Sequence, residues 1–229
     1  MQNYMHIDVD RCTIMYRLSR NNNPSSSNIT YNPSNSKYYV QFGGKRIETT
    51  VTDRAAVAND WVTAIRSKHA GEPTVVVGLD NEWRPHPVSY MSNKSATLQL
   101  CVDEDCLILQ LFHMDEIPEE LKRFLSDPTF VFVGVEVADD VRKLREEYGL
   151  ECAKSEDIRE LAKEKWPGRF RRPGLKDLAM EICGLNMPKP KHVCMSNWEV
   201  RELSLAQVEY ACIDAYASYK IGQRLLLEN

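Results

Sequence analysis

The 229-residue sequence has no Cys-x-x-Cys pair and no apolar run long enough to cross a membrane. Its seven cysteines stand apart, several of them inside apolar runs, so zinc-finger and thioredoxin-like motifs find no support. Reduced thiols used as small core residues fit this pattern. The first residues also lack the basic start and apolar run of a signal peptide. We therefore expect a globular protein of a reducing compartment, the cytoplasm or the nucleus, with no membrane partner.

The sequence also lacks an excess of basic residues, since 33 acidic residues stand against 29 basic ones, for a net charge of −4. This balance argues against nucleic-acid binding through bulk charge. Residues 163–176 nevertheless hold six basic side chains among Trp166 and Phe170. Basic residues beside aromatic ones suit a single strand, whose phosphates need neutralising and whose bases stack. The alternative is a solvated loop with its aromatic rings packed inward. The basic residues are Lys163, Lys165, Arg169, Arg171, Arg172 and Lys176, and a second basic group is Lys189, Lys191 and His192.

Composition divides the chain near residue 36. Residues 21–36 are almost all Asn, Ser, Pro and other turn formers, which predicts a flexible linker within an N-terminal extension, residues 1–36. We expect one domain over residues 37–229. Its pattern predicts a hairpin, a three-strand meander, one further buried strand and several helices. The hairpin is expected at 38–42 and 46–51, the meander at 74–79, 96–102 and 106–112, and the further strand at 129–135. Helices are expected at 53–68, 138–148, 156–165, 174–183 and 205–227, with a short one that begins at 118. We therefore predict an α/β fold with a mixed sheet flanked by helices.

Two carboxylates, Asp80 and Glu82, come directly after the most hydrophobic predicted strand. Residues two apart in an extended chain point to the same side, so both carboxylates face one way. Charges at the end of a buried strand need a salt bridge, a hydrogen-bond network or a metal. An Asp-x-Glu sequence alone is a weak signal, because a solvated pair at a strand end would look the same.

Two further acidic clusters follow later elements. Asp139 and Asp140 come after the second buried strand, where an aspartate either caps the next helix or serves a site, and the residues leave the choice between them open. Tyr210 and Asp214 are four apart and share one face of the long helix. Small residues around Asp214 allow this helix to approach another element closely. A buried aspartate bonded to a local hydroxyl is the alternative for Asp214.

Taken together, the acidic clusters predict a metal centre. Asp80, Glu82, one aspartate of the second cluster and Asp214 can converge on hard cations such as Mg²⁺ or Mn²⁺. Two such ions stabilise the attacking and leaving oxygens of a phosphoryl displacement. Tyr210 would hold or deprotonate the attacking water. The chemistry that this set suggests is phosphodiester hydrolysis.

The acidic motifs resemble those of the DEDDy branch of the DnaQ-like, RNase H-like 3′–5′ exonucleases. Over residues 73–225 the order and spacing of the motifs are similar to the exonuclease domain of Werner-syndrome-type proteins. Residues 42–52 look most like the short plant members, the RISC-interacting clearing exoribonucleases. The segments that carry the resemblance are 76–83, 97–100, 132–135, 143–144, 174–179, 196–198 and 210–216.

The resemblance implies residue roles that the pattern alone leaves open. It selects Asp140 as the third metal ligand, because Lys143 and Leu144 follow it at the family spacing. Two Mg²⁺ ions, with Mn²⁺ as the alternative, would be held by Asp80, Glu82, Asp140 and Asp214. Catalysis would need these four and Tyr210. The single-stranded nucleic acid would contact Trp83, Gln99, Lys165, Arg169, Arg171, Arg172 and Lys176.

The resemblance also implies a substrate and an assembly. The expected substrate is single-stranded RNA degraded from its 3′ end, by a homo-oligomer such as a hexamer, with RNA-silencing proteins as partners. Two alternatives are a Werner-like exonuclease acting on DNA and a catalytically weak oligomeric RNA-binding module. One departure is Glu136, which stands where the family usually has glycine. A glutamate there could obstruct the substrate, add a metal ligand or turn outward, and we expect the last, which leaves an active enzyme.

Overall fold

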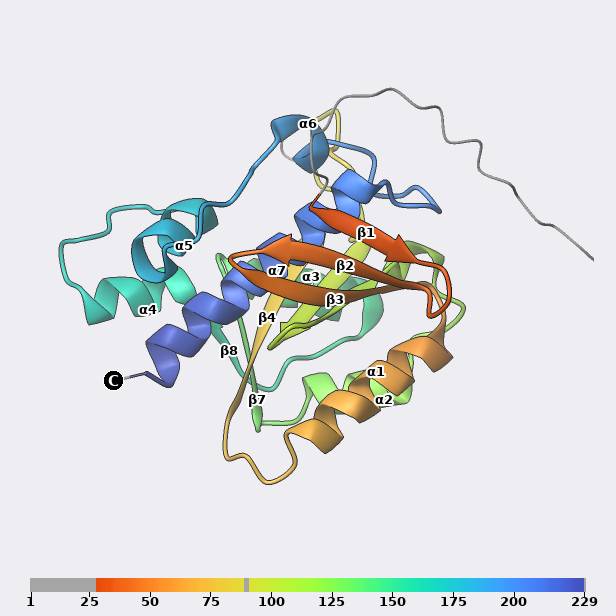
Figure 1. Cartoon of the computed structure of the whole chain (residues 1–229), viewed down its shortest axis with the longest axis horizontal. Helices are drawn as coiled ribbons and strands as arrows, with labels where there is room; N and C mark the ends of the chain where they lie inside the picture. Colours follow the sequence, from red (N-terminus) through yellow and green to blue (C-terminus); the bar gives the residue numbers. More distant parts are fainter. Residues whose placement is uncertain (1–27, 89–90, 229) are drawn as a thin grey trace, which may run out of the picture.

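The computed structural model describes residues 28–88 and 91–228, and these form an eight-stranded sheet with helices on both faces (Figure 1). The strand order is β1-β2-β3-β6-β5-β4-β7-β8. The strands are β1 (Ile29–Asn32), β2 (Lys37–Phe42), β3 (Lys45–Thr52), β4 (Val75–Glu82), β5 (Thr97–Val102), β6 (Asp105–Leu109), β7 (Phe130–Gly134) and β8 (Ser155–Asp157). The helices are α1 (Ala55–Lys68), α2 (Glu119–Leu125), α3 (Val137–Tyr148), α4 (Ile158–Lys165), α5 (Leu175–Cys183), α6 (Lys191–Cys194) and α7 (Leu205–Leu226), with a 3₁₀ turn at Leu111–His113.

The sheet mixes antiparallel and parallel pairs, as predicted. Strands β4, β5 and β6 form the antiparallel meander, while β3 runs parallel to β6, and β4, β7 and β8 run parallel to one another. The predicted hairpin is β2 and β3, joined by a turn in which Gly43 and Gly44 both have positive φ. The predicted α/β fold with a helix-flanked mixed sheet is confirmed.

Strand β1 corrects the predicted linker. It lies inside residues 21–36, pairs antiparallel with β2, and buries Ile29, which is 4% exposed. Ile29 belongs to the same apolar cluster as Val40 and Ile47 of the hairpin, so one buried side chain and a ladder of backbone hydrogen bonds order a segment of polar composition. The rest of the predicted extension, residues 1–27, lies outside the described residues.

Two apolar clusters lie on opposite faces of the sheet. Helices α4 to α7 cover one face, and α1, α2 and α3 cover the other. Cys101, Cys106 and Cys212 are fully buried free thiols, as expected, while Cys12 lies outside the described residues. Among the helices of the described residues, none has the length and apolar character that a membrane crossing requires.

The long helix α7 crosses the sheet and packs against β4 (Figure 1). It begins at the predicted capping box, in which Ser204 accepts from the backbone N–H of Gln207 and the Gln207 side chain accepts from that of Ser204. Gly78 of β4 faces it so closely that a Cβ there would lie 2.0 Å from the carbonyl oxygen of Ala215. The helix and strand therefore meet backbone to backbone.

Replacing Gly78 by alanine tests this contact. We expect Gly78→Ala to lower the free energy of unfolding by about 3 kcal/mol, because the new methyl forces α7 away from the sheet. Gly174→Ala is the matched control, since its Cβ would meet nothing closer than 3.7 Å and its φ is −81°. Urea denaturation followed by circular dichroism measures both, and equal stabilities would contradict the close packing.

Candidate metal centre

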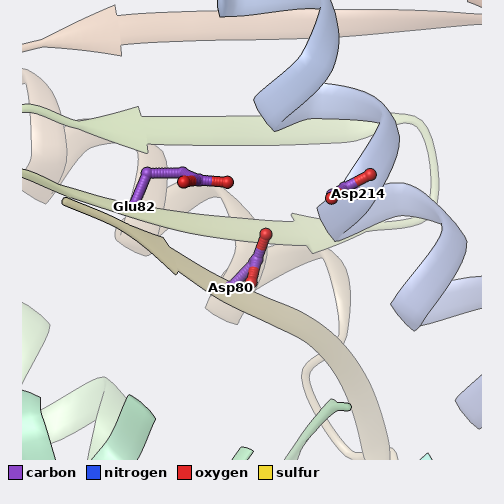
Figure 2. A group of neighbouring side chains, drawn as sticks. All are labelled: Asp80, Glu82 and Asp214. Carbon is purple, nitrogen blue, oxygen red and sulfur yellow. The ribbon is translucent and has the colours of Figure 1, made fainter. Parts of the chain in front are cut away.

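Three carboxylates converge where β4 ends beside the middle of α7 (Figure 2). One oxygen each from Asp80, Glu82 and Asp214 lies within 4.8 Å of the others. Strand β4 continues through Glu82, beyond its predicted end at residue 79, so both of its carboxylates project on the same face as Gly78. Asp214 directly precedes Ala215, which contacts Gly78. The close contact of α7 with β4 therefore brings the third carboxylate to the other two.

The three carboxylates disfavour one another's charge. Burial and then the charge of Asp214 raise the pKa of Asp80 to about 7. Burial and then Asp80 raise the pKa of Glu82 far above the usual carboxyl range. Burial also raises the pKa of Asp214, although the Lys189 ammonium and the Tyr210 hydroxyl oppose this rise. The cluster is therefore a place where added positive charge is strongly favoured.

The oxygen atoms of this cluster suit a hard divalent cation. Asp214 Oδ1 is buried and has no hydrogen-bond partner within residues 28–88 and 91–228. A buried acceptor without a donor is costly, and a cation would satisfy it. Carboxylate oxygens are the ligands that Mg²⁺ and Mn²⁺ prefer. The residues present fit a metal ion.

Asp140 lies close to this cluster but outside it. It is in the first turn of α3 and only 8% exposed, and burial and then the charge of Asp80 raise its pKa. Its backbone carbonyl accepts from Asn81 Nδ2 at 3.2 Å, which ties α3 to β4. Asp139, in contrast, is 71% exposed and pairs with Arg142 at 3.2 Å. Of the two aspartates that the sequence left open, Asp140 is the buried one, and its carboxyl group interacts with the charge of Asp80.

Tyr210 lies one helical turn before Asp214 and is 5% exposed. Its ring centroid is 5.9 Å from that of Trp198, a core residue. Burial and then the charges of Asp214 and Glu82 raise its pKa above that of a free phenol. Without a cation the hydroxyl therefore keeps its proton, which suits holding a water molecule more than deprotonating one.

A cleft of about 420 Å³ opens beside Asp80 and Asp140, and Trp83, which we predicted to contact nucleic acid, forms part of its wall. Lys143 is buried beneath Trp83, with its Nζ 5.0 Å from the ring centroid. This ammonium donates to Glu147 Oε1 at 2.6 Å and to the Asn93 carbonyl at 2.9 Å. It thus holds the loop that follows β4 against α3. The lining residues are Asp80, Asn81, Trp83, Ser92, Val135, Glu136, Asp139, Asp140, Arg142 and Lys143.

Glu136 has the backbone conformation that favours glycine, with φ at +57°. Its carboxylate pairs with Arg159 Nη1 at 2.8 Å, and its side chain is 63% exposed. Arg159 also donates to the Pro173 carbonyl at 3.0 Å. The side chain is therefore engaged by α4 at the rim of the cleft, in agreement with the expected outward orientation.

Three residues predicted to contact nucleic acid lie away from the cleft. Lys165 Nζ donates to the backbone carbonyl of Glu228, which follows α7, and lies 3.4 Å from the backbone carbonyl of Arg224. Arg224 is ten residues after Asp214 on the same helix, which is about 15 Å along the helix axis. Arg169 pairs with Glu181 of α5 at 3.0 Å. Helix α4 thus carries the start of the basic segment toward the distal end of α7, away from the cleft. Contact of Lys165 and Arg169 with nucleic acid stays a prediction.

Gln99 is the third of these residues and it is fully buried. It pairs in register with Asp80, and its Nε2 donates to Thr97 Oγ1 at 2.6 Å. Gln99 therefore lies beside Asp80 on the neighbouring strand β5 and exposes no surface for direct contact with nucleic acid in this structure. Three other basic residues, Arg171, Arg172 and Lys176, are exposed and lie close to Pro173 in the sequence. Their contact with nucleic acid stays a prediction.

One contact was missed entirely. Lys189 Nζ lies 3.0 Å from Asp214 Oδ2, inside the acidic cluster. The sequence places Lys189 in a basic group with Lys191 and His192, between two prolines that restrict the backbone, but nothing in it points to Asp214 as its partner. The pair joins residues 25 positions apart, and only the folded chain shows it.

The acidic cluster predicts a dependence of stability on pH. Folding raises the pKa of Asp80 from 3.8 to about 7, so between these values the folded protein binds more protons than the unfolded chain. With EDTA present, the free energy of unfolding should therefore fall as pH rises from about 4 through 7. Saturating Mn²⁺ should reverse the fall by neutralising the carboxylates. Urea titrations at each pH measure both effects, and a metal-free protein that gains stability over this range would contradict the arrangement.

Comparison with known proteins agrees with this geometry. Residues 49–228 match the family model of a 3′–5′ exonuclease domain. A 3′–5′ exonuclease of Arabidopsis thaliana is 34% identical over 185 residues, covering 80% of this chain and 64% of the relative. The mouse bifunctional 3′–5′ exonuclease and ATP-dependent helicase WRN is 30% identical over 157 residues, covering 66% of this chain and 11% of that protein.

A solved structure shares the fold. Escherichia coli RNase D superposes with a TM-score of 0.65 at 20% identity, over 79% of this chain and 44% of that one. The chain thus spans less than two thirds of the length of the relatives it matches. Because the family model covers most of the chain, from β3 to the end of α7, the chain belongs to the 3′–5′ exonuclease family.

Proposed function

We propose that this protein removes nucleotides from the 3′ end of single-stranded nucleic acid, with RNA as the preferred substrate. The observation that carries the proposal is the convergence of Asp80, Glu82 and Asp214, with a buried oxygen of Asp214 left without a partner. Family membership supplies the class of reaction. Asp140 completes the set of acidic residues from the other side of β4.

The proposed reaction is hydrolysis of the last phosphodiester. Two Mg²⁺ ions, or Mn²⁺, would supply Lewis-acid stabilisation of the attacking and leaving oxygens. Asp80, Glu82, Asp140 and Asp214 would hold them, and the Tyr210 hydroxyl would orient the water. Water adds to phosphorus, the bond from phosphorus to the preceding 3′ oxygen breaks, and that oxygen takes up a proton. A nucleoside 5′-monophosphate leaves.

The preference for RNA is supported by the likeness of residues 42–52 to the plant clearing exoribonucleases. The same likeness supports a homo-oligomer in the cytoplasm or nucleus. The resemblance of residues 73–225 to Werner-syndrome-type exonuclease domains supports DNA as the alternative substrate. We assign four side chains to contact with the nucleic acid: Trp83, which lines the cleft, and the exposed Arg171, Arg172 and Lys176, which are close to Pro173 in the sequence.

Matched RNA and DNA oligonucleotides decide the substrate. Each is labelled at its 5′ end and incubated with the full chain and Mg²⁺, and products are resolved on a denaturing gel. We expect a ladder shortening from the 3′ end, faster for RNA. Faster shortening of DNA would favour the Werner-like alternative. Binding without shortening of either strand would favour a binding module and contradict the proposal.

The two neighbouring aspartates of α3 give a matched pair of variants. Asp140→Asn should lower the cleavage rate by about 10²-fold or more, because it removes a buried carboxylate that faces the site. Asp139→Asn should leave the rate within about twofold, since that side chain is exposed and only pairs with Arg142. The gel assay compares both, and the reverse order would show that Asp139 is the functional residue.

Glu136 gives a second test. Glu136→Gly places a glycine at a left-handed backbone position, which should raise the free energy of unfolding by about 1 kcal/mol. It also removes the exposed ion pair with Arg159, which should lower the free energy of unfolding by about as much or less. We therefore expect little change in stability and a cleavage rate within about threefold of the unmodified protein. Asp80→Ala should lose at least a hundred times more activity, about the cost of losing one key electrostatic contact. An inactive parent protein that Glu136→Gly activates would contradict the outward orientation of this side chain.

A further inference from the structure

Lys189 is the cation that reaches the acidic cluster. Its ammonium lies 3.0 Å from Asp214 Oδ2, and its positive charge also acts on Asp80 and Glu82. Its Nζ is 5.7 Å from the centroid of the Tyr210 ring. Within the described residues, no other lysine, arginine or histidine forms an ion pair with Asp80, Glu82 or Asp214. One ammonium therefore stands among three carboxylates and the tyrosine.

The segment that carries Lys189 is anchored on both sides. Met187 is 1% exposed and Val193 is 4% exposed, and both belong to the apolar cluster beneath α7. Pro188 and Pro190 restrict the backbone between these anchors. The Lys189 side chain is 37% exposed, whereas that of Asp214 is 3% exposed. The backbone is thus held in place while a flexible side chain remains free to change partners.

The contact between Lys189 and Asp214 competes with cation binding. A divalent cation prefers the same carboxylate oxygens that the ammonium contacts, and it brings twice the charge. When the carboxylates hold a cation, Lys189 loses its partner but stays tethered at the site. In that state the phosphate of a bound nucleic acid is an anion that can take the place of Asp214 as the partner of Lys189. Lysine binds phosphate as a compact point charge.

We propose that Lys189 is a catalytic residue whose ammonium moves from Asp214 to a non-bridging oxygen of the scissile phosphodiester. This inference rests on the proposed exonuclease function. There the ammonium stabilises the negative charge that accumulates on phosphate oxygens in the transition state. The ion pair with Asp214 is the position of the side chain before metal and substrate bind. A purely structural counter-ion of Asp214 would support the carboxylate cluster in every state.

Two measurements on Lys189→Gln separate these roles. Calorimetric titration of the metal-free protein with Mn²⁺ should show binding at least as tight as in the unmodified protein, because a competitor has been removed. Steady-state cleavage of the preferred oligonucleotide should show kcat lower by about 10²-fold with KM changed less than threefold. Lys189→Arg should recover part of kcat. Lys45→Gln, which removes the surface pair with Glu104 at 2.8 Å, is the control and should change neither quantity.

The outcomes separate this inference from the proposed function. Weaker Mn²⁺ binding in Lys189→Gln would show that the ammonium supports the cluster, and would overturn the inference. An unchanged kcat in an active enzyme would also overturn it, while leaving the exonuclease function in place. An unmodified protein that shortens no strand would overturn both.

Discussion

The close contact between helix α7 and strand β4 is the constraint on which the site depends. Gly78 leaves no side chain between the two backbones, and Ala215 and Gly222 keep the facing side of the helix small. A larger residue at any of these positions would lift α7 from the sheet and carry Asp214 away from Asp80. The requirement for small residues and the convergence of the carboxylates are therefore one geometric fact. Stability and the metal centre share the same packing.

This packing has an electrostatic cost. Asp80, Glu82 and Asp214 are brought together in a poorly hydrated place, where their charges repel and burial raises the pKa of each. Folding therefore works against these groups unless a cation or protons are present. The surrounding apolar clusters on both faces of the sheet supply the stability that tolerates this arrangement. Electrostatic repulsion among buried carboxylates is expected at a site that binds a divalent cation.

Sequence reasoning succeeded where local pattern and structure coincide. Alternation along β4 placed Asp80 and Glu82 on one face, and helical spacing placed Tyr210 one turn from Asp214. Failure came where position depends on distant parts of the chain. Nothing near Ile29 reveals that its strand completes the sheet edge.

The same reason explains why the sequence did not reveal where the basic segment lies or the ion pair of Lys189. Residues 163–176 form a local run of charge, but the direction of α4 decides which of them reach the cleft, and Lys165 ends beside the C-terminus of α7. Lys189 lies in a segment without helical or strand pattern, and its partner is known only once α7 is placed. Propensity and spacing describe neighbours along the chain, whereas these contacts join separate elements.

The net charge of −4 fits this division of the molecule. Rigid elements, β4, α3 and α7, carry the acidic residues, whereas the exposed basic residues Arg171, Arg172 and Lys176 lie just before and at the start of α5. An acidic centre attracts cations and repels a phosphate backbone until those cations are bound. If the proposed function holds, binding of nucleic acid depends on prior or simultaneous binding of metal. Among the residues that line the cleft, only Arg142 and Lys143 are basic, so the cleft suits contact with a short end of nucleic acid more than a grip on a long duplex.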